Sequence, residues 1–178
     1  SITPCLWVTG DVDEVIAYYT GAFPDLRTES FSRMPDGTVV TAEITMAGQR
    51  FMLLAGGPAD WNFTESVSFY LGCNGQVEVD RFWDYFTADG GEESQCGWLK
   101  DKYGLSWQIV PKEFEDMMGG DDPEKVRRMI QAMFTMQKLD IAALQKQTHG
   151  IAASLHDDAS ADLDAALQRF FDRERTLL

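Results

Sequence analysis

The stretch that most constrains the fold is residues 96–111, which read Cys-Gly-Trp-Leu-Lys-Asp-Lys-Tyr-Gly-Leu-Ser-Trp-Gln-Ile-Val-Pro. One predicted strand ends near Leu99, and the four residues from Asp101 supply a turn in which Gly104 is free to adopt a positive φ. The chain then returns as a second strand, which ends at Pro111 because proline cannot donate to a strand ladder. The sequence therefore predicts a β-hairpin.

Side-chain alternation gives the returning strand two different faces. Three apolar residues share one face: Leu105, Trp107 and Ile109. The opposite face carries Ser106, Gln108 and Val110. We therefore expect one face to pack in a core and the other to line something polar.

The hairpin ends the second of two similar predicted modules. Alternation and helical periodicity predict, for residues 1–57, strands at 3–9, 27–33, 38–46 and 49–55, with a helix between Asp11 and Pro24. For residues 62–111 they predict strands at 66–73, 92–99 and 105–111, with a helix whose apolar stripe is Val79, Phe82, Trp83 and Phe86. A repeat of about 60 residues is too long for a solenoid and indicates an internal duplication of a βαβββ unit.

The remainder of the chain reads as helical. Asp122-Pro123 is typical of a helix start, and Asp140 heads a second short helix. We expect one domain over residues 1–147, built from modules 1–57 and 62–111 and helices within 112–147. Residues 148–178 are predicted to be a linker followed by an amphipathic helix.

Composition restricts the class of protein. With 44% hydrophobic and 12% aromatic residues, 178 residues suffice for a soluble globular core without metal or disulfide staples. A net charge of −14 disfavours nucleic acid and anionic membranes as partners. Three cysteines without metal-ligand spacing, no apolar run of bilayer length and no basic leader in the first residues all favour a cytoplasmic protein.

Further motifs accompany the hairpin: Asp89-Gly90-Gly91-Glu92 before it, Met136-Gln137-Lys138-Leu139-Asp140-Ile141 after it, and Ile2-Thr3-Pro4-Cys5-Leu6-Trp7 at the start of the chain. Together they resemble the PhnB-like branch of the glyoxalase, or vicinal oxygen chelate, superfamily, which is also labelled 3-demethylubiquinone-9 3-methyltransferase-like. The resemblance covers residues 2–147. It implies an α+β fold in which two βαβββ modules form curved mixed sheets with a cavity inside, together with C-terminal helices.

The resemblance also indicates where metal-dependent relatives hold their ion. The four corresponding positions are Pro4, Met52, roughly Ser66, and Gln108. An isolated amide is a poor transition-metal ligand, and the two histidines, His149 and His156, lie outside both modules. We therefore expect neither a resident metal nor another cofactor. The absence of a Gly-x-Gly-x-x-Gly motif speaks against a dinucleotide or methyl-donor site.

Glu43 is the candidate catalytic residue. Alternation in strand 38–46 puts Glu43 on the face opposite the helix, where a carboxylate with a raised pKa could act as a general base. The competing interpretation is a solvated or Arg-paired strand residue. Cys96 has no neighbouring histidine to act as its base, which favours a buried inert thiol over a nucleophile.

The predicted ligand-binding residues combine aromatic walls with polar groups. They are Trp98, Ser106, Gln108, Trp61 and Met52. Trp83 and Trp107 are expected in the core instead.

These features predict a homodimer that binds, and either transforms or merely holds, a small hydrophobic or aromatic compound without a tightly held metal. The alternatives are an antibiotic-sequestering type of binding protein, a metal-dependent lyase or dioxygenase, and an interaction module that uses its acidic surface.

Overall fold

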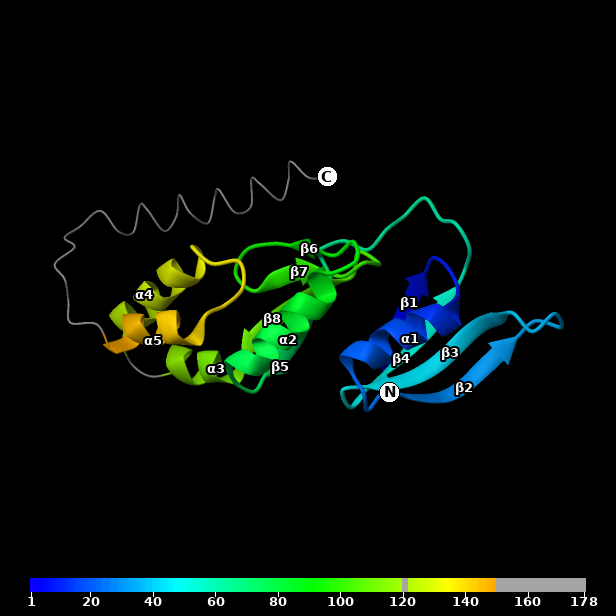
Figure 1. Cartoon of the computed structure of the whole chain (residues 1–178), viewed down its shortest axis with the longest axis horizontal. Coiled ribbons are helices and arrows are strands. Elements are labelled where there is room, and N and C mark those ends of the chain that lie inside the picture. Colours follow the sequence, from blue (N-terminus) through cyan, green and yellow to red (C-terminus); the bar gives the residue numbers. More distant parts are fainter. Residues whose placement is uncertain (120–121, 150–178) are drawn as a thin grey trace. The chain divides into compact units, whose positions relative to one another are not determined.

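The computed structural model describes residues 1–119 and 122–149, and the chain divides after Thr64 into two units. Each unit contains a four-stranded sheet with one helix packed on one face (Figure 1). The predicted α+β class and the two βαβββ modules are therefore confirmed. Among the described residues, no helix has both the length and the apolar character that crossing a bilayer requires.

The first unit follows the predicted order of elements. They are β1 (Cys5–Val8), α1 (Val12–Ala22), β2 (Arg27–Arg33), β3 (Val39–Met46) and β4 (Gln49–Ala55). The spatial order of the strands is β1-β4-β3-β2, with β1 parallel to β4 and the other pairs antiparallel. The parallel pair exists because α1 returns the chain to the same end of the sheet before β2 begins.

Local chemistry explains why α1 begins and how it packs. The Asp11 carboxylate accepts a hydrogen bond from the Asp13 amide at 2.7 Å, which satisfies one free N–H of the first turn. Four residues of α1 are buried: Val12, Val15, Tyr19 and Ala22. They pack on the helix-facing side of the sheet, where Ile44 and Leu53 are fully buried.

The second unit repeats this arrangement and adds three helices. Its elements are β5 (Ser68–Cys73), α2 (Gly75–Thr87), β6 (Glu92–Glu93), β7 (Trp98–Lys100), β8 (Ser106–Pro111), α3 (Lys112–Met118), α4 (Pro123–Met133) and α5 (Ile141–His149). The strand order β5-β8-β7-β6, with β5 parallel to β8, matches that of the first sheet. The predicted linker starts at residue 148, whereas α5 continues to His149; the rest of the predicted linker and the final amphipathic helix, with His156, lie outside the described residues.

Trp107 is buried in the core of the second unit, as predicted. Its ring stacks on Phe86 of α2 at 4.7 Å between centroids and meets Phe69 of β5 edge-on at 5.5 Å. Its indole N–H donates to the buried Asp101 carboxylate at 3.0 Å, which also accepts from the Leu105 amide at 3.1 Å. Asp101 therefore ties the hairpin turn to the core.

The predicted strand at 92–99 is broken into β6 and β7, which corrects the sequence expectation. Cys96 and Gly97 both have positive φ, and their amides donate to the carbonyls of Met136 and Gln137 at 2.8 and 2.7 Å. A Cβ at Gly97 would lie 2.9 Å from the Ile109 carbonyl oxygen, so glycine is required. A segment 40 residues away therefore takes the hydrogen bonds that a strand partner would otherwise make.

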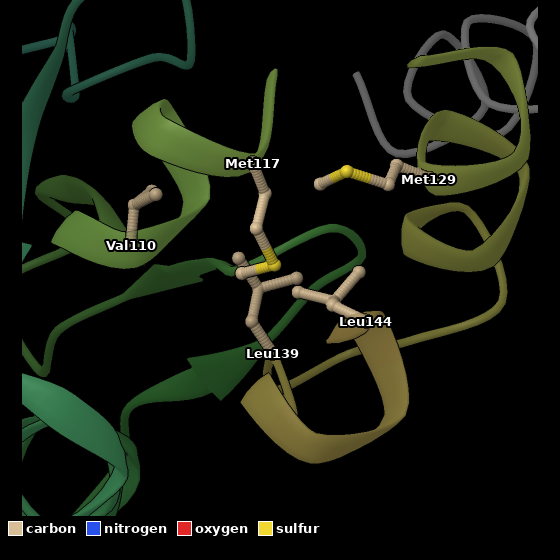
Figure 2. Packing of buried hydrophobic residues seen from close by; sticks show 5 residues of the cluster. All are labelled: Val110, Met117, Met129, Leu139 and Leu144. Atoms are coloured by element: carbon tan, nitrogen blue, oxygen red, sulfur yellow. The ribbon is translucent and has the colours of Figure 1, made fainter. Parts of the chain in front are cut away.

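The added helices form a second hydrophobic cluster. Its buried members are Val110, Met117, Met129, Leu139 and Leu144, and Figure 2 shows their side chains gathered between α3, α4 and α5. Val110 was expected on a face that lines something polar. It is instead buried, because α3 turns back over the end of β8.

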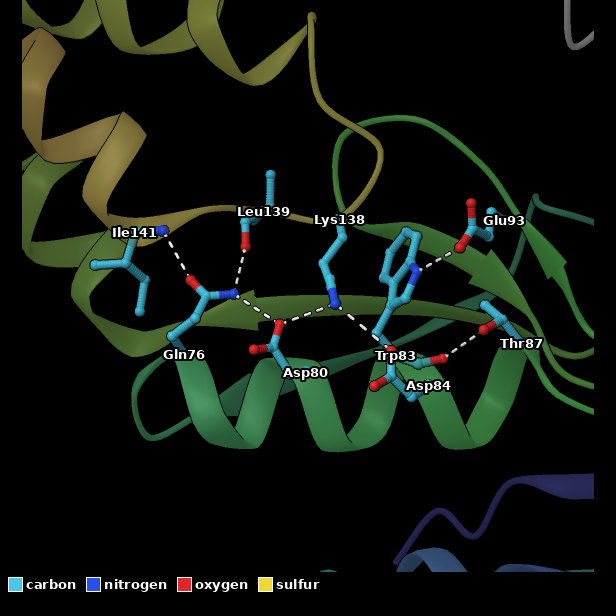
Figure 3. A network of polar contacts seen from close by, with 9 residues as sticks. All are labelled: Gln76, Asp80, Trp83, Asp84, Thr87, Glu93, Lys138, Leu139 and Ile141. Atoms are coloured by element: carbon cyan, nitrogen blue, oxygen red, sulfur yellow. Dashed lines mark hydrogen bonds and ion pairs between the residues drawn. The ribbon is translucent and has the colours of Figure 1, made fainter.

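A polar network fastens residues 138–141 to α2 (Figure 3). The Gln76 side chain donates to the Leu139 carbonyl at 3.0 Å and accepts from the Ile141 amide at 2.9 Å. Lys138 pairs with Asp80 at 3.0 Å and with Asp84 at 3.5 Å. The helices are thus attached to the second unit through both backbone and side-chain contacts.

Candidate functional site

The face of the first sheet opposite α1, which we call the first open face, carries the predicted residues Glu43 and Met52. These two residues oppose each other in register on β3 and β4, and Cys5 of β1 is aligned with Met52. Glu43 and Met52 are half-buried and Cys5 is exposed. The predicted alternation of β3 therefore holds at Glu43, and its catalytic role stays a prediction.

Glu43 has a basic neighbour on this face. Its Oε2 lies 3.2 Å from Nη2 of Arg50, and the Arg50 side chain is 57% exposed. The structure thus shows the geometry of the Arg-paired alternative. A role as base therefore requires that a substrate displace the Arg50 guanidinium from the Glu43 carboxylate.

Trp61 lies against Trp7 of β1. The two rings meet edge-on at 5.2 Å between centroids, and the Trp7 indole donates to the Gly57 carbonyl at 3.3 Å. A Cβ at Gly56 would lie 1.8 Å from the Trp7 ring, so this glycine lets the backbone approach the indole. Trp61 remains 60% exposed and therefore presents an aromatic surface beside the first open face.

The face of the second sheet opposite α2, which we call the second open face, carries Trp98, Ser106 and Gln108. Trp98 of β7 is in register with Gln108 of β8, which is in register with Tyr70 of β5. One row further along, Lys100, Ser106 and Ser68 are aligned in the same way. The register therefore brings the three predicted residues of this unit together.

Polar contacts fix several of these side chains. Gln108 Nε2 donates to Ser68 Oγ at 2.9 Å. Lys100 forms an ion pair with Glu65, and its hydrogen bond lowers the pKa of the Glu65 carboxyl. Ser106 is 1% exposed, and its hydroxyl has no hydrogen-bond partner within the described part of the chain. A ligand reaches Ser106 only by displacing the side chains that cover it.

Tyr70 and α3 are site elements that the sequence reasoning missed. The Tyr70 hydroxyl donates to Glu115 Oε1 of α3 at 3.2 Å, and desolvation together with this negative charge raises the pKa of Tyr70. Lys112 lies over Gly72, since a Cβ there would be 3.5 Å from Lys112 Cγ. The alternation of Ser68 and Tyr70 along β5 was a usable signal for Tyr70, whereas no sequence pattern indicated α3.

Of the four positions that correspond to metal ligands in metal-dependent relatives, Pro4 and Met52 lie in the first unit and Ser66 and Gln108 in the second. The Pro4 carbonyl accepts from the Met52 amide at 2.9 Å, as an ordinary ladder bond. Ser66 precedes β5, and Gln108 is aligned with Tyr70 instead. Within residues 1–119 and 122–149, no group of three or more His, Cys, Asp or Glu side chains is arranged to hold a metal ion.

Cys96 fits the interpretation of an inert thiol. It is 8% exposed, and burial raises the pKa of its thiol to about 11. At neutral pH the thiol form, which is a poor nucleophile, dominates.

Comparisons with known proteins agree with this fold. Residues 1–110 match the family described as 3-demethylubiquinone-9 3-methyltransferase. A solved structure from Bacillus cereus, described as a putative 3-demethylubiquinone-9 3-methyltransferase, PhnB protein, is 30% identical, with a TM-score of 0.57 over 62% of this chain and 98% of that one. The search of curated proteins gave no match.

A second structure extends the likeness at the level of the fold. The fosfomycin resistance protein FosX from Listeria monocytogenes is 14% identical, with a TM-score of 0.50 over 67% of this chain and 97% of that one. The family match over residues 1–110 and the likeness to the PhnB protein from Bacillus cereus show that the chain belongs to the PhnB-like, 3-demethylubiquinone-9 3-methyltransferase family.

Proposed function

We propose that this protein binds a small hydrophobic or aromatic organic molecule on the open faces of its sheets. The observation that carries the proposal is the row Trp98–Gln108–Tyr70, in which a hydrogen-bonding amide stands between two aromatic side chains on the face away from α2. Aromatic surface with a few convergent polar groups is the usual composition of a small-molecule site.

We further propose that binding needs no tightly held metal. The donor set at the four family positions argues for this, because a proline, a thioether, a hydroxyl and an amide offer no strong ligand for a divalent cation. FosX structures from Listeria monocytogenes are described with Mn(II), so the two proteins would differ in this respect. One equivalent of manganese, zinc, nickel or iron that survives dialysis against a chelator would contradict the proposal.

An enzymatic role would rest on Glu43. Its carboxylate stands on the first open face beside Arg50, and a substrate that displaces the guanidinium would meet a base held by a rigid strand. Glu43→Gln keeps the size of the side chain and removes the base. We expect this variant to abolish turnover and to retain binding. Glu14→Gln on the exposed side of α1, across the sheet from Glu43, is the matched control.

The experiment that tests the binding function is a thermal-shift screen against small aromatics, quinones, antibiotics and divalent metals. A ligand that binds only the native state raises the melting temperature, by an amount that grows with concentration. We expect shifts with organic compounds in the presence of a chelator. Shifts with metals alone would favour the lyase or dioxygenase, and no shift with any organic compound would refute the proposal.

Mass spectrometry of each organic ligand after incubation with the protein separates the two remaining functions. Chemical change that depends on Glu43 identifies an enzyme, whereas unchanged ligand identifies a sequestering protein. We propose that the chain acts in either case as a homodimer in the cytoplasm. The exposed edge strands of the two sheets and the acidic net charge of −14 are compatible with this setting.

A further inference from the structure

Three side chains lie next to one another across the second open face. Tyr70, Gln108 and Trp98 occupy one register position on the adjacent strands β5, β8 and β7. Neighbouring strands are about 4.8 Å apart, so the Cα atoms of the two aromatic residues are separated by roughly 9.6 Å. Tyr70 is 50% exposed and Trp98 is half-buried, so both rings contribute surface to this face.

This spacing matches the thickness of a flat ring between two aromatic side chains. Carbon atoms in contact are about 3.5–4.0 Å apart, so a planar ring with an aromatic neighbour on each side needs roughly 7–8 Å. Side chains that lean slightly toward each other close the remaining distance. A puckered saturated ring is thicker and presents no π face, so it fits the same interval less well.

Gln108 lies on the strand between Tyr70 and Trp98, and one polar atom of its side chain is available to bind a ligand. Its Nε2 donates to Ser68 Oγ at 2.9 Å. Its Oε1 has no hydrogen-bond partner among residues 1–119 and 122–149. An amide oxygen in this position accepts a hydrogen bond from a donor on the edge of a ring that stands above it.

Tyr70 is held from a part of the chain outside the family match at residues 1–110. Its hydroxyl donates to Glu115 of α3, and the Lys112 side chain of the same helix covers Gly72, one row along from Tyr70. Helix α3 is in turn packed through Met117 into the cluster of Figure 2. The added helices therefore hold Tyr70, one of the two aromatic residues of the row, in place.

The surroundings of the row favour an uncharged ligand. The ammonium group of Lys100, one row away, is neutralised by Glu65, and Lys112 donates to the side chain of Asn74 at 2.8 Å. With Glu115 at the end of the row and a net charge of −14 on the chain, an anion would gain no attraction here.

We propose that Tyr70 and Trp98 hold a planar, uncharged aromatic ring over Gln108, whose amide oxygen accepts a hydrogen bond from a hydroxyl or N–H group on the ring edge, and that Glu115 positions Tyr70 for this role. The proposal rests on the proposed function and narrows it to one class of ligand. It also gives a role in ligand selection to α3, which lies outside the family match and positions Tyr70 through Glu115.

Isothermal titration calorimetry with three probes tests the ligand class. The first is 2-naphthol, which is planar and carries a donor; the second is 2-methoxynaphthalene, which is planar without a donor; the third is 2-decalol, which has the donor on puckered rings. We expect 2-naphthol to bind saturably and at least about fivefold more tightly than either of the others. Equal affinities, or no binding of 2-naphthol at millimolar concentration, would overturn the proposal.

Variants test the residues. Trp98→Leu and Tyr70→Leu should each weaken 2-naphthol binding about fivefold. Gln108→Leu should lower the affinity for 2-naphthol to that for 2-methoxynaphthalene and leave the latter unchanged. Phe31→Leu on β2 removes an aromatic ring that is 42% exposed in the first unit, and should change nothing. Unchanged affinity for 2-naphthol in both Trp98→Leu and Tyr70→Leu would refute the proposal that these two side chains hold the ring.

A double-mutant cycle tests the positioning role of Glu115. Glu115→Ala should weaken 2-naphthol binding in the parent protein but have no effect in a Tyr70→Phe background, because the hydroxyl through which it acts is then absent. Equal effects in both backgrounds would show a merely structural role. If 2-naphthol does not bind while the thermal-shift screen finds other organic ligands, the role of Tyr70 and Trp98 in holding a planar ring is wrong and the proposed function stands. If the screen finds no organic ligand either, both proposals are wrong.

Discussion

Replacing Trp107 by alanine tests whether the hairpin faces are assigned correctly. Trp107 is 3% exposed, stacks on Phe86, and donates its indole N–H to Asp101. Removing such a ring from a core costs about 3–5 kcal/mol of the free energy of unfolding. The loss of a hydrogen bond to a buried carboxylate adds to this, since bonds to charged groups contribute about 1.5–3 kcal/mol. We therefore expect Trp107→Ala to lower the free energy of unfolding by about 5 kcal/mol or more.

Trp98→Ala is the matched control, because Trp98 lies in the same hairpin on the opposite face and is only half-buried. Its replacement should cost about 1 kcal/mol. Urea unfolding followed by circular dichroism measures both variants, and an unchanged m value shows that stability alone has changed. Equal losses in the two variants, or a loss below about 1 kcal/mol for Trp107→Ala, would show that the faces are reversed.

Three further predictions concern thiols, acid sensitivity and assembly. Burial raises the pKa of Cys73 to about 12 and that of Cys96 to about 11, while Cys5 is exposed. A thiol-specific reagent at pH 8 should therefore modify Cys5 alone until denaturant is added, and rapid modification of all three would contradict the burial. A hydrogen bond from the Gln76 side chain lowers the pKa of Asp80 below its ordinary value of 3.8. The Asp80 carboxylate therefore stabilises the folded chain above pH 3.8, and this stabilisation is lost as the pH falls through the lowered pKa. Asp80→Asn should thus cost less than about 1 kcal/mol at pH 7, because the Asp80 and Lys138 side chains are both partly exposed to solvent, and the cost should shrink as the pH falls below 3.8. A cost that does not change with pH would refute this account. Sedimentation should give twice the chain mass of 20.0 kDa, and a monomer at tens of micromolar would contradict dimerisation.

Regular alternation explains which parts of the fold were predictable. Strands β2 and β4 have the bounds expected from the sequence, and Asp11 and Asp140 mark helix starts through side-chain hydrogen bonds to nearby amides. These features depend on residues a few positions apart. The same local rule put Glu43 and Gln108 on the faces that they occupy.

The features that sequence reasoning missed depend on contacts between distant segments. Cys96 and Gly97 bond to carbonyls near residue 136 and so break the expected strand. Glu115 meets Tyr70 across 45 positions, and neither residue alone indicates a site. Ser106 was predicted from alternation to reach a ligand, but alternation specifies a face and cannot say whether other side chains cover that face.

The most direct test of ligand binding on the second open face is a nuclear magnetic resonance titration of the tryptophan indole N–H signals with 2-naphthol. The chain has five tryptophans, whose signals are assigned by single replacement with phenylalanine. The account predicts that the Trp98 signal shifts and saturates, while those of Trp83 and Trp107, which lie on the α2 side of the sheet, stay in place. Saturable shifts of the Trp83 or Trp107 signals with an unchanged Trp98 signal would place the ligand on the other side and contradict the account.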